Sequence, residues 1–369
     1  MPEQLSDQQQ QLRERAADFA RQVLEPLRGA DAAAARSTVV AESKRAGFFA
    51  MTQPKAFGGS EASTLELTTV RDELAAHNPP FVDAVFGPGP GVLADAGEPI
   101  ASDYLAPVLA GEKRGAFGFT EPDDAPQPTR GAIANGTLTI NGQKSYVTGG
   151  ASADFINTLV QIEDHGPAMV VIDTDADGVT LARRFSSLDG SHHAAFTFTD
   201  VCVPEGHIIG KPGEGMPRAM RQIGDTRLAI AARCVGTMRW VLDYLTEHLE
   251  KPDRSGRPRG AKEGVRMRYA DLRIKTFAAR SMLYRTARLA DTGANIVNEG
   301  IACKVFATES VAEVVDTAIQ LVGGTALTDE HPLAMLYKQV RALRLAEGGS
   351  DVLRLNLARG RLELGKGIL

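Results

Sequence analysis

The chain has 369 residues, of which 43% are hydrophobic and 24% are charged. This length and balance predict two or three packed domains and exclude a largely disordered protein. The net charge of -5 argues against a general nucleic-acid binder, which normally carries a basic excess. No apolar run approaches about 18 residues, so we expect no membrane span. The polar N-terminus is unlike a signal or transit peptide, and we therefore expect a cytoplasmic protein.

The first third of the chain has the apolar spacing of helices. We expect a first helix within residues 4–28, which Pro26 should kink or close. Further helices are expected at 38–49, 64–76 and 104–110, separated by segments rich in glycine and proline. Residues 1–113 are therefore predicted to form an N-terminal helical domain.

Alternating apolar residues replace the helical spacing from Gly115 onward. Strands are expected around 138–140, 168–172 and 195–203. Asn141-Gly142 follows the first of these, and the pair favours a tight hairpin turn because both residues accept positive φ angles. Residues 114–213 are therefore predicted to form a small β domain, a barrel or a sandwich.

The cysteine and histidine residues give no sign of a metal site. Cys202, Cys234 and Cys303 are scattered, and we expect them to be small buried hydrophobic residues. His192 and His193 are adjacent on a predicted strand, where neighbouring side chains point to opposite faces and cannot readily share one ion. We therefore predict no metal.

Helical spacing returns after residue 213 and persists to the end. Long helices are expected at 220–250, 263–292, 296–322 and 332–346, with a shorter one at 351–362, so residues 214–369 are predicted to form a four-helix bundle. The loop 251–262 carries four Arg and Lys residues between Arg254 and Lys262. Such a run either is simply solvated or meets phosphate groups. The fold class expected for the whole chain is α+β.

Glu347 is the candidate catalytic residue. Gly348 and Gly349 follow it directly, just before the last predicted helix, and glycine permits a tight turn that presents a carboxylate and leaves backbone N–H groups free. The competing interpretation is an exposed acidic group that merely favours the helix dipole.

Several segments together resemble those of one known family. They are Phe117-Gly118-Phe119-Thr120-Glu121-Pro122, the segment 141–150 with sequence Asn-Gly-Gln-Lys-Ser-Tyr-Val-Thr-Gly-Gly, the strand 198–204, Asp225-Thr226-Arg227, the segment 320–324 with sequence Gln-Leu-Val-Gly-Gly, and Glu347-Gly348-Gly349. In this order, within a helical, β and helical arrangement, they resemble the acyl-CoA dehydrogenases.

The resemblance implies a chemistry and a cofactor. Such enzymes bind FAD and oxidise the α,β bond of an acyl-CoA to the 2-enoyl-CoA, with a base taking the α proton while hydride passes to flavin N5. Glu347 matches the base, and its backbone N–H matches a donor to the thioester oxygen. Thr148 matches the hydroxyl near flavin N5, and Thr120 matches one near the pyrimidine edge. An electron-transfer flavoprotein is the implied electron acceptor.

The resemblance also implies the remaining binding residues. The cofactor contacts implied by the motifs are Phe119, Thr120, Tyr146, Thr148, Arg254, Gln320, Gly323, Gly324 and Gly348. Thr226, Arg227 and Gly348 are assigned to the acyl-CoA, although Arg227 could equally hold a bundle ion pair.

The sequence departs from the family where one subunit serves another or holds the substrate. The usual Gly-x-Gly-Ser-Asp is replaced by residues 123–128, and the Arg-x-x-Phe-Gly that contacts a partner's FAD falls on 252–256 without its arginine or phenylalanine. The chain thus resembles either a homo-oligomeric dehydrogenase of fatty or steroid degradation or a subunit of a heterotetramer of the sterol-side-chain type. The alternatives are a largely non-catalytic partner subunit and a flavin monooxygenase or oxidase on the same fold.

Overall fold

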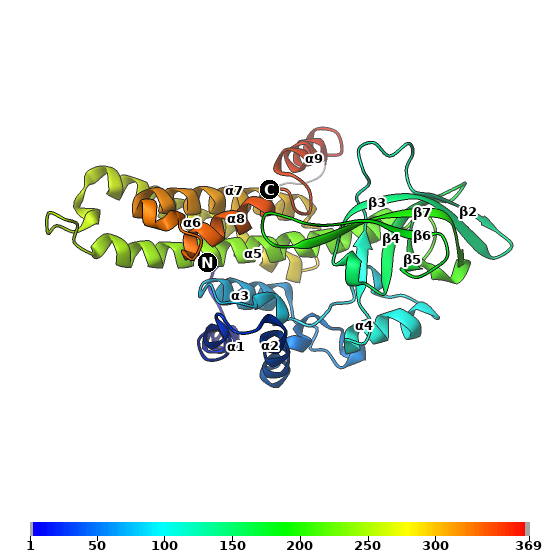
Figure 1. Ribbon diagram of the computed structural model, residues 1–369, viewed down its shortest axis with the longest axis horizontal. Helices are drawn as coiled ribbons and strands as arrows, with labels where there is room; N and C mark the ends of the chain where they lie inside the picture. Colours follow the sequence, from blue (N-terminus) through cyan, green and yellow to red (C-terminus); the bar gives the residue numbers. More distant parts are fainter. Residues whose placement is uncertain (1–2, 366–369) are drawn as a thin grey trace. The chain divides into compact units, whose positions relative to one another are not determined.

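A computed structural model describes residues 3–365, which fold into two compact units (Figure 1). The helical unit takes in the chain up to Phe49, residues 62–86 and the chain from Gly224 onward. The sheet unit takes in Ala50–Glu61 and Gly87–Ile223. Over the described range 3–365, no helix is long and apolar enough to cross a membrane.

The helical unit combines N-terminal helices with a C-terminal bundle. Its elements are α1 (Asp7–Phe19), α2 (Ala32–Ala46), α3 (Thr64–Ala75), α5 (Gly215–Glu250, from Gly224 onward), α6 (Glu263–Asp291), α7 (Val297–Val322), α8 (Pro332–Leu343) and α9 (Ser350–Leu362). Capping boxes built on Ser6 and Ser63 begin α1 and α3, because each serine hydroxyl accepts a hydrogen bond from an otherwise unpaired backbone N–H. The chain leaves α1 through a π-helical turn, Ala20–Leu24, and a 3₁₀ turn that contains Pro26.

The core of the helical unit lies between α5, α6, α7 and α8, where α6 packs on α7 and α7 on α8 (Figure 1). Asp72 on α3 is buried beside this core, with 0% of its surface exposed. Its carboxylate accepts hydrogen bonds from Arg239 (3.0 Å), Arg280 (3.3 Å) and Tyr284 (2.9 Å). This network ties α3 to α5 and α6, because a buried carboxylate is stable only when it is paired and hydrogen-bonded.

The sheet unit is built on one mixed sheet. Its strands are β1 (Gly115–Gly118), β2 (Arg130–Ala134), β3 (Thr137–Thr148), β4 (Phe155–Ile162), β5 (Gly166–Asp173), β6 (Val179–Ser186), β7 (His192–Pro204) and β8 (Ile208–Ile209). The strand order is β6-β7-β3-β2-β4-β5-β8, and β1 pairs parallel to β4. The short helix α4 (Ala106–Ala110) belongs to the same unit, and its Val108 and Leu109 join a second core with Phe155 and Met169.

The hairpin turn predicted at Asn141-Gly142 is wrong. The turn lies instead at Asn135-Gly136, where both residues have positive φ (52° and 76°) and connect β2 to β3. Asn141 and Gly142 continue β3, which pairs with β7 across an irregularity at this point. The Asn141 side chain is bonded to Asp200 on β7 through its amide nitrogen (2.9 Å) and its oxygen (2.9 Å).

The other sequence expectations mostly hold. The expected α+β class is confirmed: an N-terminal helical domain, a mixed-sheet middle domain and a C-terminal helical domain. The second helix begins earlier than expected, because the Asp31 side chain caps it by accepting a hydrogen bond from the N–H of Ala34 at 2.9 Å. Cys234 and Cys303 are buried as expected, but Cys202 is exposed on β7, so the expectation for that residue was wrong.

Candidate active site

Glu347 lies on a left-handed turn between α8 and α9. Its φ is 54°, and that of Gly348 is 100°, a region that side chains disfavour and glycine accepts. A Cβ at Gly348 would also lie 3.0 Å from the Leu353 side chain, too close for an unaltered fit. The Glu-Gly-Gly pattern therefore has a structural reason, which is to let the chain present Glu347 immediately before α9.

Two cationic side chains hold the backbone of this turn. Arg227 on α5 donates from Nε to the carbonyl oxygen of Glu347 at 3.0 Å. Lys304 on α7 donates from Nζ to the carbonyl oxygen of Gly348 at 2.9 Å and to that of Arg344 at 3.4 Å. Two successive carbonyl groups of the turn are thus fixed from two different helices. Nε of Arg227 therefore bonds a backbone carbonyl and does not form an ion pair within the bundle.

Sequence reasoning missed Lys304. The residue is fully buried, and it was absorbed into the apolar run of a predicted helix. A single lysine flanked by Cys303, Val305 and Phe306 was the signal that could have found it, because a lysine is almost never fully buried unless its ammonium group is bonded.

The surroundings of Glu347 favour a basic carboxylate. Burial raises its pKa above the ordinary value, although the positive charges of Arg227 and Lys304 partly oppose the shift. Burial also lowers the pKa of Lys304 to about 8, and it lowers the pKa of Arg227. A carboxylate with a raised pKa binds a proton more strongly and is a better general base near neutral pH.

In the sheet unit, an ion pair with a buried lysine joins the two motif segments expected at the flavin. Lys144 on β3 is 1% exposed and donates to the Glu121 carboxylate at 2.7 Å and to the Phe119 carbonyl at 3.3 Å. The backbone N–H of Ser145 donates to the Thr120 carbonyl at 2.8 Å. The glutamate and lysine of these motifs therefore align the segment carrying Phe119 and Thr120 along β3.

Tyr146 and Thr148 are exposed on the same strand. Tyr146 has a left-handed backbone (φ 52°), is 61% exposed, and packs edge-on against Phe185 with 5.1 Å between ring centroids. The Thr148 hydroxyl lies 3.1 Å from Nδ1 of His193 on β7. With the exposed Thr120, β3 and its neighbouring segment offer hydroxyls and an aromatic ring without a charge. These uncharged polar groups and the ring suit a flat, uncharged, polar heterocycle such as the flavin ring of FAD.

Gln320, Gly323 and Gly324 lie at the far end of α7. Gly323 has φ 93° and ends the helix, and its N–H donates to the carbonyl of Ile319 at 2.8 Å. Gln320 lines a hollow of about 250 Å³ whose other described lining residues include three acidic side chains. Residues 304 and 320 belong to one helix that rises about 1.5 Å per residue, so Gln320 lies about 24 Å along the axis from Lys304.

Arg254 lies in the basic loop between α5 and α6, exposed to solvent. Within the loop, Arg259 donates to the carbonyls of Lys251 (3.2 Å) and Pro252 (2.9 Å), and Lys262 pairs with Asp253 at 3.0 Å. These bonds fold the loop onto itself.

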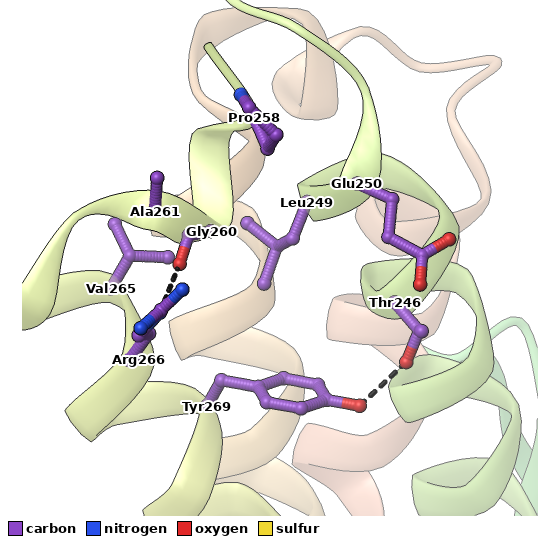
Figure 2. Close-up of a pocket in the computed structure, with 9 residues that line it drawn as sticks. All are labelled: Thr246, Leu249, Glu250, Pro258, Gly260, Ala261, Val265, Arg266 and Tyr269. Atoms are coloured by element: carbon purple, nitrogen blue, oxygen red, sulfur yellow. Dashed lines mark hydrogen bonds between the residues drawn. The ribbon is translucent and has the colours of Figure 1, made fainter.

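A pocket of about 350 Å³ lies beside the loop, between the end of α5 and the start of α6 (Figure 2). Figure 2 shows its apolar wall, with Leu249 and Val265, and the hydrogen bond of 2.5 Å between Thr246 and Tyr269. Among the described residues that line it, Arg266 is the one cation, and its Nε is occupied by the Gly260 carbonyl at 2.8 Å. The pocket is therefore suited to an apolar group rather than to a phosphate.

The predicted site residues thus form separate groups within each unit. In the helical unit, Glu347, Gly348 and Arg227 are in direct contact, and Thr226 precedes Arg227 on α5. Gln320 lies near the end of α7, with Gly323 and Gly324 directly after the helix, and Arg254 lies in the loop after α5. In the sheet unit, Phe119, Thr120, Tyr146 and Thr148 are carried by two segments that are hydrogen-bonded to each other.

Family models identify both helical portions of the chain. The model "Acyl-CoA dehydrogenase, N-terminal domain" matches residues 6–112, and "Acyl-CoA dehydrogenase, C-terminal domain" matches residues 213–362. The chain belongs to the acyl-CoA dehydrogenase family. It is therefore an enzyme of the acyl-CoA dehydrogenase class, and FAD is the cofactor of this family.

Relatives and solved structures agree with the family and the fold. An acyl-CoA dehydrogenase of Bacillus subtilis is 26% identical over 85% of this chain and 86% of its own length. The CarC subunit of the caffeyl-CoA reductase-Etf complex of Acetobacterium woodii is 26% identical over 83% of this chain and 84% of its own length. The crystal structure of a probable acyl-CoA dehydrogenase from Mycobacterium abscessus superposes with a TM-score of 0.84 at 24% identity, covering 96% of this chain and 98% of that one.

Proposed function

We propose that the chain is an FAD-dependent acyl-CoA dehydrogenase in which Glu347 removes the α proton of an acyl-CoA thioester. The observation that carries the proposal is the half-buried carboxylate with a raised pKa on a turn whose backbone carbonyls are bonded by Arg227 and Lys304. A flavin monooxygenase of the same fold has no need of a base at this position, so the retained carboxylate favours dehydrogenation.

The residues of this chain divide the work. Glu347 takes the α proton, and its raised pKa brings the carboxylate closer in basicity to that weakly acidic C–H group. The backbone N–H of Glu347 donates to the thioester oxygen, where negative charge develops. The hydrogen bonds from Arg227 and Lys304 to the backbone of the turn keep this N–H and the carboxylate in fixed positions, so little reorganisation is needed as the proton moves.

FAD, when bound, accepts the hydride from the β carbon. On this proposal Thr120 and Thr148 bind the polar edge of the flavin, and Phe119 and Tyr146 flank its ring. Gln320, Gly323, Gly324, Arg254 and Gly348 are assigned to the rest of the cofactor, and Thr226 with Arg227 and Gly348 to the acyl-CoA. The uncharged hydroxyls and the aromatic ring offered by β3 and by the segment of Thr120 support this division.

An electron-transfer flavoprotein is proposed as the electron acceptor, and the named complex of the Acetobacterium woodii relative supports it.

The basic loop between α5 and α6 bears on how subunits assemble. In the described part of the chain, the Arg254 and Arg257 side chains make no hydrogen bond or ion pair with other protein groups, and both are exposed. Two guanidinium groups are thus available to a neighbouring subunit, which supports either a homo-oligomer or a heterotetramer with a related chain.

The proposal is tested by purifying the chain, recording its visible spectrum, and screening acyl-CoA esters with an artificial electron acceptor. The panel should include straight short-chain, branched and steroid side-chain thioesters. A yellow homo-oligomer that converts one class to the 2-enoyl-CoA would support the proposal and a complete cofactor site. A folded, colourless chain that gains flavin and activity only with a co-purified related chain would replace the homo-oligomer by the heterotetramer. Flavin reoxidation by air with substrate hydroxylation would overturn the dehydrogenase assignment.

A further inference from the structure

A chain of hydrogen bonds runs from a carboxylate to Thr148 in the sheet unit. The Ser191 hydroxyl donates to the Asp189 carboxylate at 2.7 Å, and Ser191 Oγ lies 2.9 Å from Nε2 of His193. On the other side of the ring, Nδ1 of His193 lies 3.1 Å from the Thr148 hydroxyl. His192 is not part of this chain, because its Nδ1 contacts Ser186 at 2.9 Å.

The chemistry of these groups fixes the direction of every bond. Asp189 is ionised, because the Ser191 hydroxyl and N–H hold the pKa of its carboxyl below the ordinary value despite the opposing effect of burial. A carboxylate only accepts, so the Ser191 proton points to Asp189 and Ser191 Oγ must accept from Nε2–H of His193. Nδ1 then carries no proton while the ring is neutral, and it accepts the proton of the Thr148 hydroxyl.

The surroundings of His193 keep its ring neutral at pH 7. Burial and the neighbouring His192 lower the pKa of His193, and the charge of Asp189 only partly opposes them. The other facing groups are Tyr146 on β3 and Phe185 on β6, at 5.8 Å and 5.5 Å between ring centroids. A charged group beside this cluster is the Arg183 guanidinium, which lies over the Phe185 ring, 5.0 Å from its centroid.

We infer that His193 is a positioning residue that makes the Thr148 hydroxyl an acceptor, rather than a donor, toward the flavin. This inference rests on the proposed FAD site. The N5 atom of oxidised flavin has a lone pair and needs a donor, whereas N5 of reduced flavin carries a hydrogen and needs an acceptor. A Thr148 hydroxyl committed to His193 therefore favours the reduced flavin and raises its midpoint potential.

The first test measures the midpoint potential of the flavin-loaded protein. His193→Phe removes both ring nitrogens and frees the Thr148 proton to donate to oxidised flavin. We expect the equilibrium between reduced and oxidised flavin to shift at least tenfold toward the oxidised form. For a two-electron couple this shift lowers the midpoint potential by about 30 mV. His192→Phe is the matched control and should leave the potential unchanged. Ser191→Ala removes the bond that sets the tautomer, and it should lower the potential by a smaller amount.

The second test needs no flavin. Nitrogen NMR of the ¹⁵N-histidine-labelled chain reports which ring nitrogen of His193 carries the proton, and the His193→Phe spectrum assigns its signals. Protonation at Nε2 at pH 7 supports the inference, and protonation at Nδ1 overturns it. An unchanged potential in a flavin-loaded His193→Phe protein also overturns it. If the chain takes up no flavin from excess FAD, either alone or together with a co-purified related chain, the proposed function fails first, and the role of His193 toward the flavin fails with it.

Discussion

Replacing Lys304 with Met should lower activity much more than stability. The substitution removes a charged hydrogen bond to the Gly348 carbonyl at 2.9 Å, and bonds of this kind contribute about 1.5–3 kcal/mol. The Arg344 carbonyl keeps a partner, because the N–H of Ser350 donates to it at 3.0 Å. Removing a buried ammonium group also relieves its desolvation, which offsets part of the loss in the free energy of unfolding.

If the Lys304 hydrogen bond holds the turn that carries Glu347 in its active position, losing this bond energy lowers kcat/KM by about 10- to 100-fold. We expect the free energy of unfolding to change by less than about 1.5 kcal/mol. Steady-state kinetics and urea denaturation measure the two quantities on the same preparation. Lys338→Met is the matched control, because Lys338 on α8 is an exposed partner of Asp329, and it should change neither. Unchanged kinetics for Lys304→Met, or a kinetic loss matched by an equal loss of stability, would refute the reasoning.

The pH dependence of stability gives Lys304 a second signature. Its folded pKa of about 8 lies below the ordinary value near 10.4, so the unfolded chain binds more protons between these two values. The contribution of Lys304 to the free energy of unfolding therefore rises with pH across that window. The difference in urea midpoint between the unaltered protein and Lys304→Met should therefore change in favour of the unaltered protein from pH 7 to pH 10, and a difference that stays constant would contradict the lowered pKa.

Other substitutions test the remaining parts of the account. Asp72→Ala removes the acceptor of the buried Tyr284 hydroxyl and of the half-buried Arg239 and Arg280. It should cost about 1–3 kcal/mol in the free energy of unfolding, measured by urea denaturation; a loss below about 1 kcal/mol would contradict the network. Glu121→Gln removes the charge that pairs with buried Lys144, and it should weaken FAD binding by about tenfold in a fluorescence titration. An unchanged affinity would show that this ion pair does not contribute to FAD binding. In the pH profile of kcat/KM, the rate should fall on the acidic side as Glu347 becomes protonated, with an apparent pKa above the ordinary glutamate value. An apparent pKa at or below the ordinary value would indicate that another group is the base.

The sequence predicted features whose signals are local. Helices were predicted from apolar periodicity to within a few residues at most ends, and Glu-Gly-Gly before a helix predicted a tight turn at Glu347, which the structure shows with a left-handed backbone. Local signals fail where two candidates are equal. Asn135-Gly136 and Asn141-Gly142 are the same dipeptide, and only the pairing of β3 with β7 decides which one turns.

Features that depend on contacts between distant segments were not predictable. Lys304 is 44 residues from Gly348, and its role depends on how α7 packs beside the turn. His193 and Thr148 meet only because of the register between β7 and β3. Arg227 was recognised as a site residue, but its contact with a backbone carbonyl leaves no trace in the sequence.

The central claim is that Glu347 takes the α proton, and anaerobic mixing of the flavin-loaded protein with its acyl-CoA tests it directly. Loss of the visible flavin absorbance reports reduction. The unaltered protein should bleach within the time of a turnover, whereas Glu347→Gln should keep its flavin and bind the acyl-CoA without bleaching. Bleaching of Glu347→Gln at the unaltered rate would show that another group takes the proton and would contradict the account.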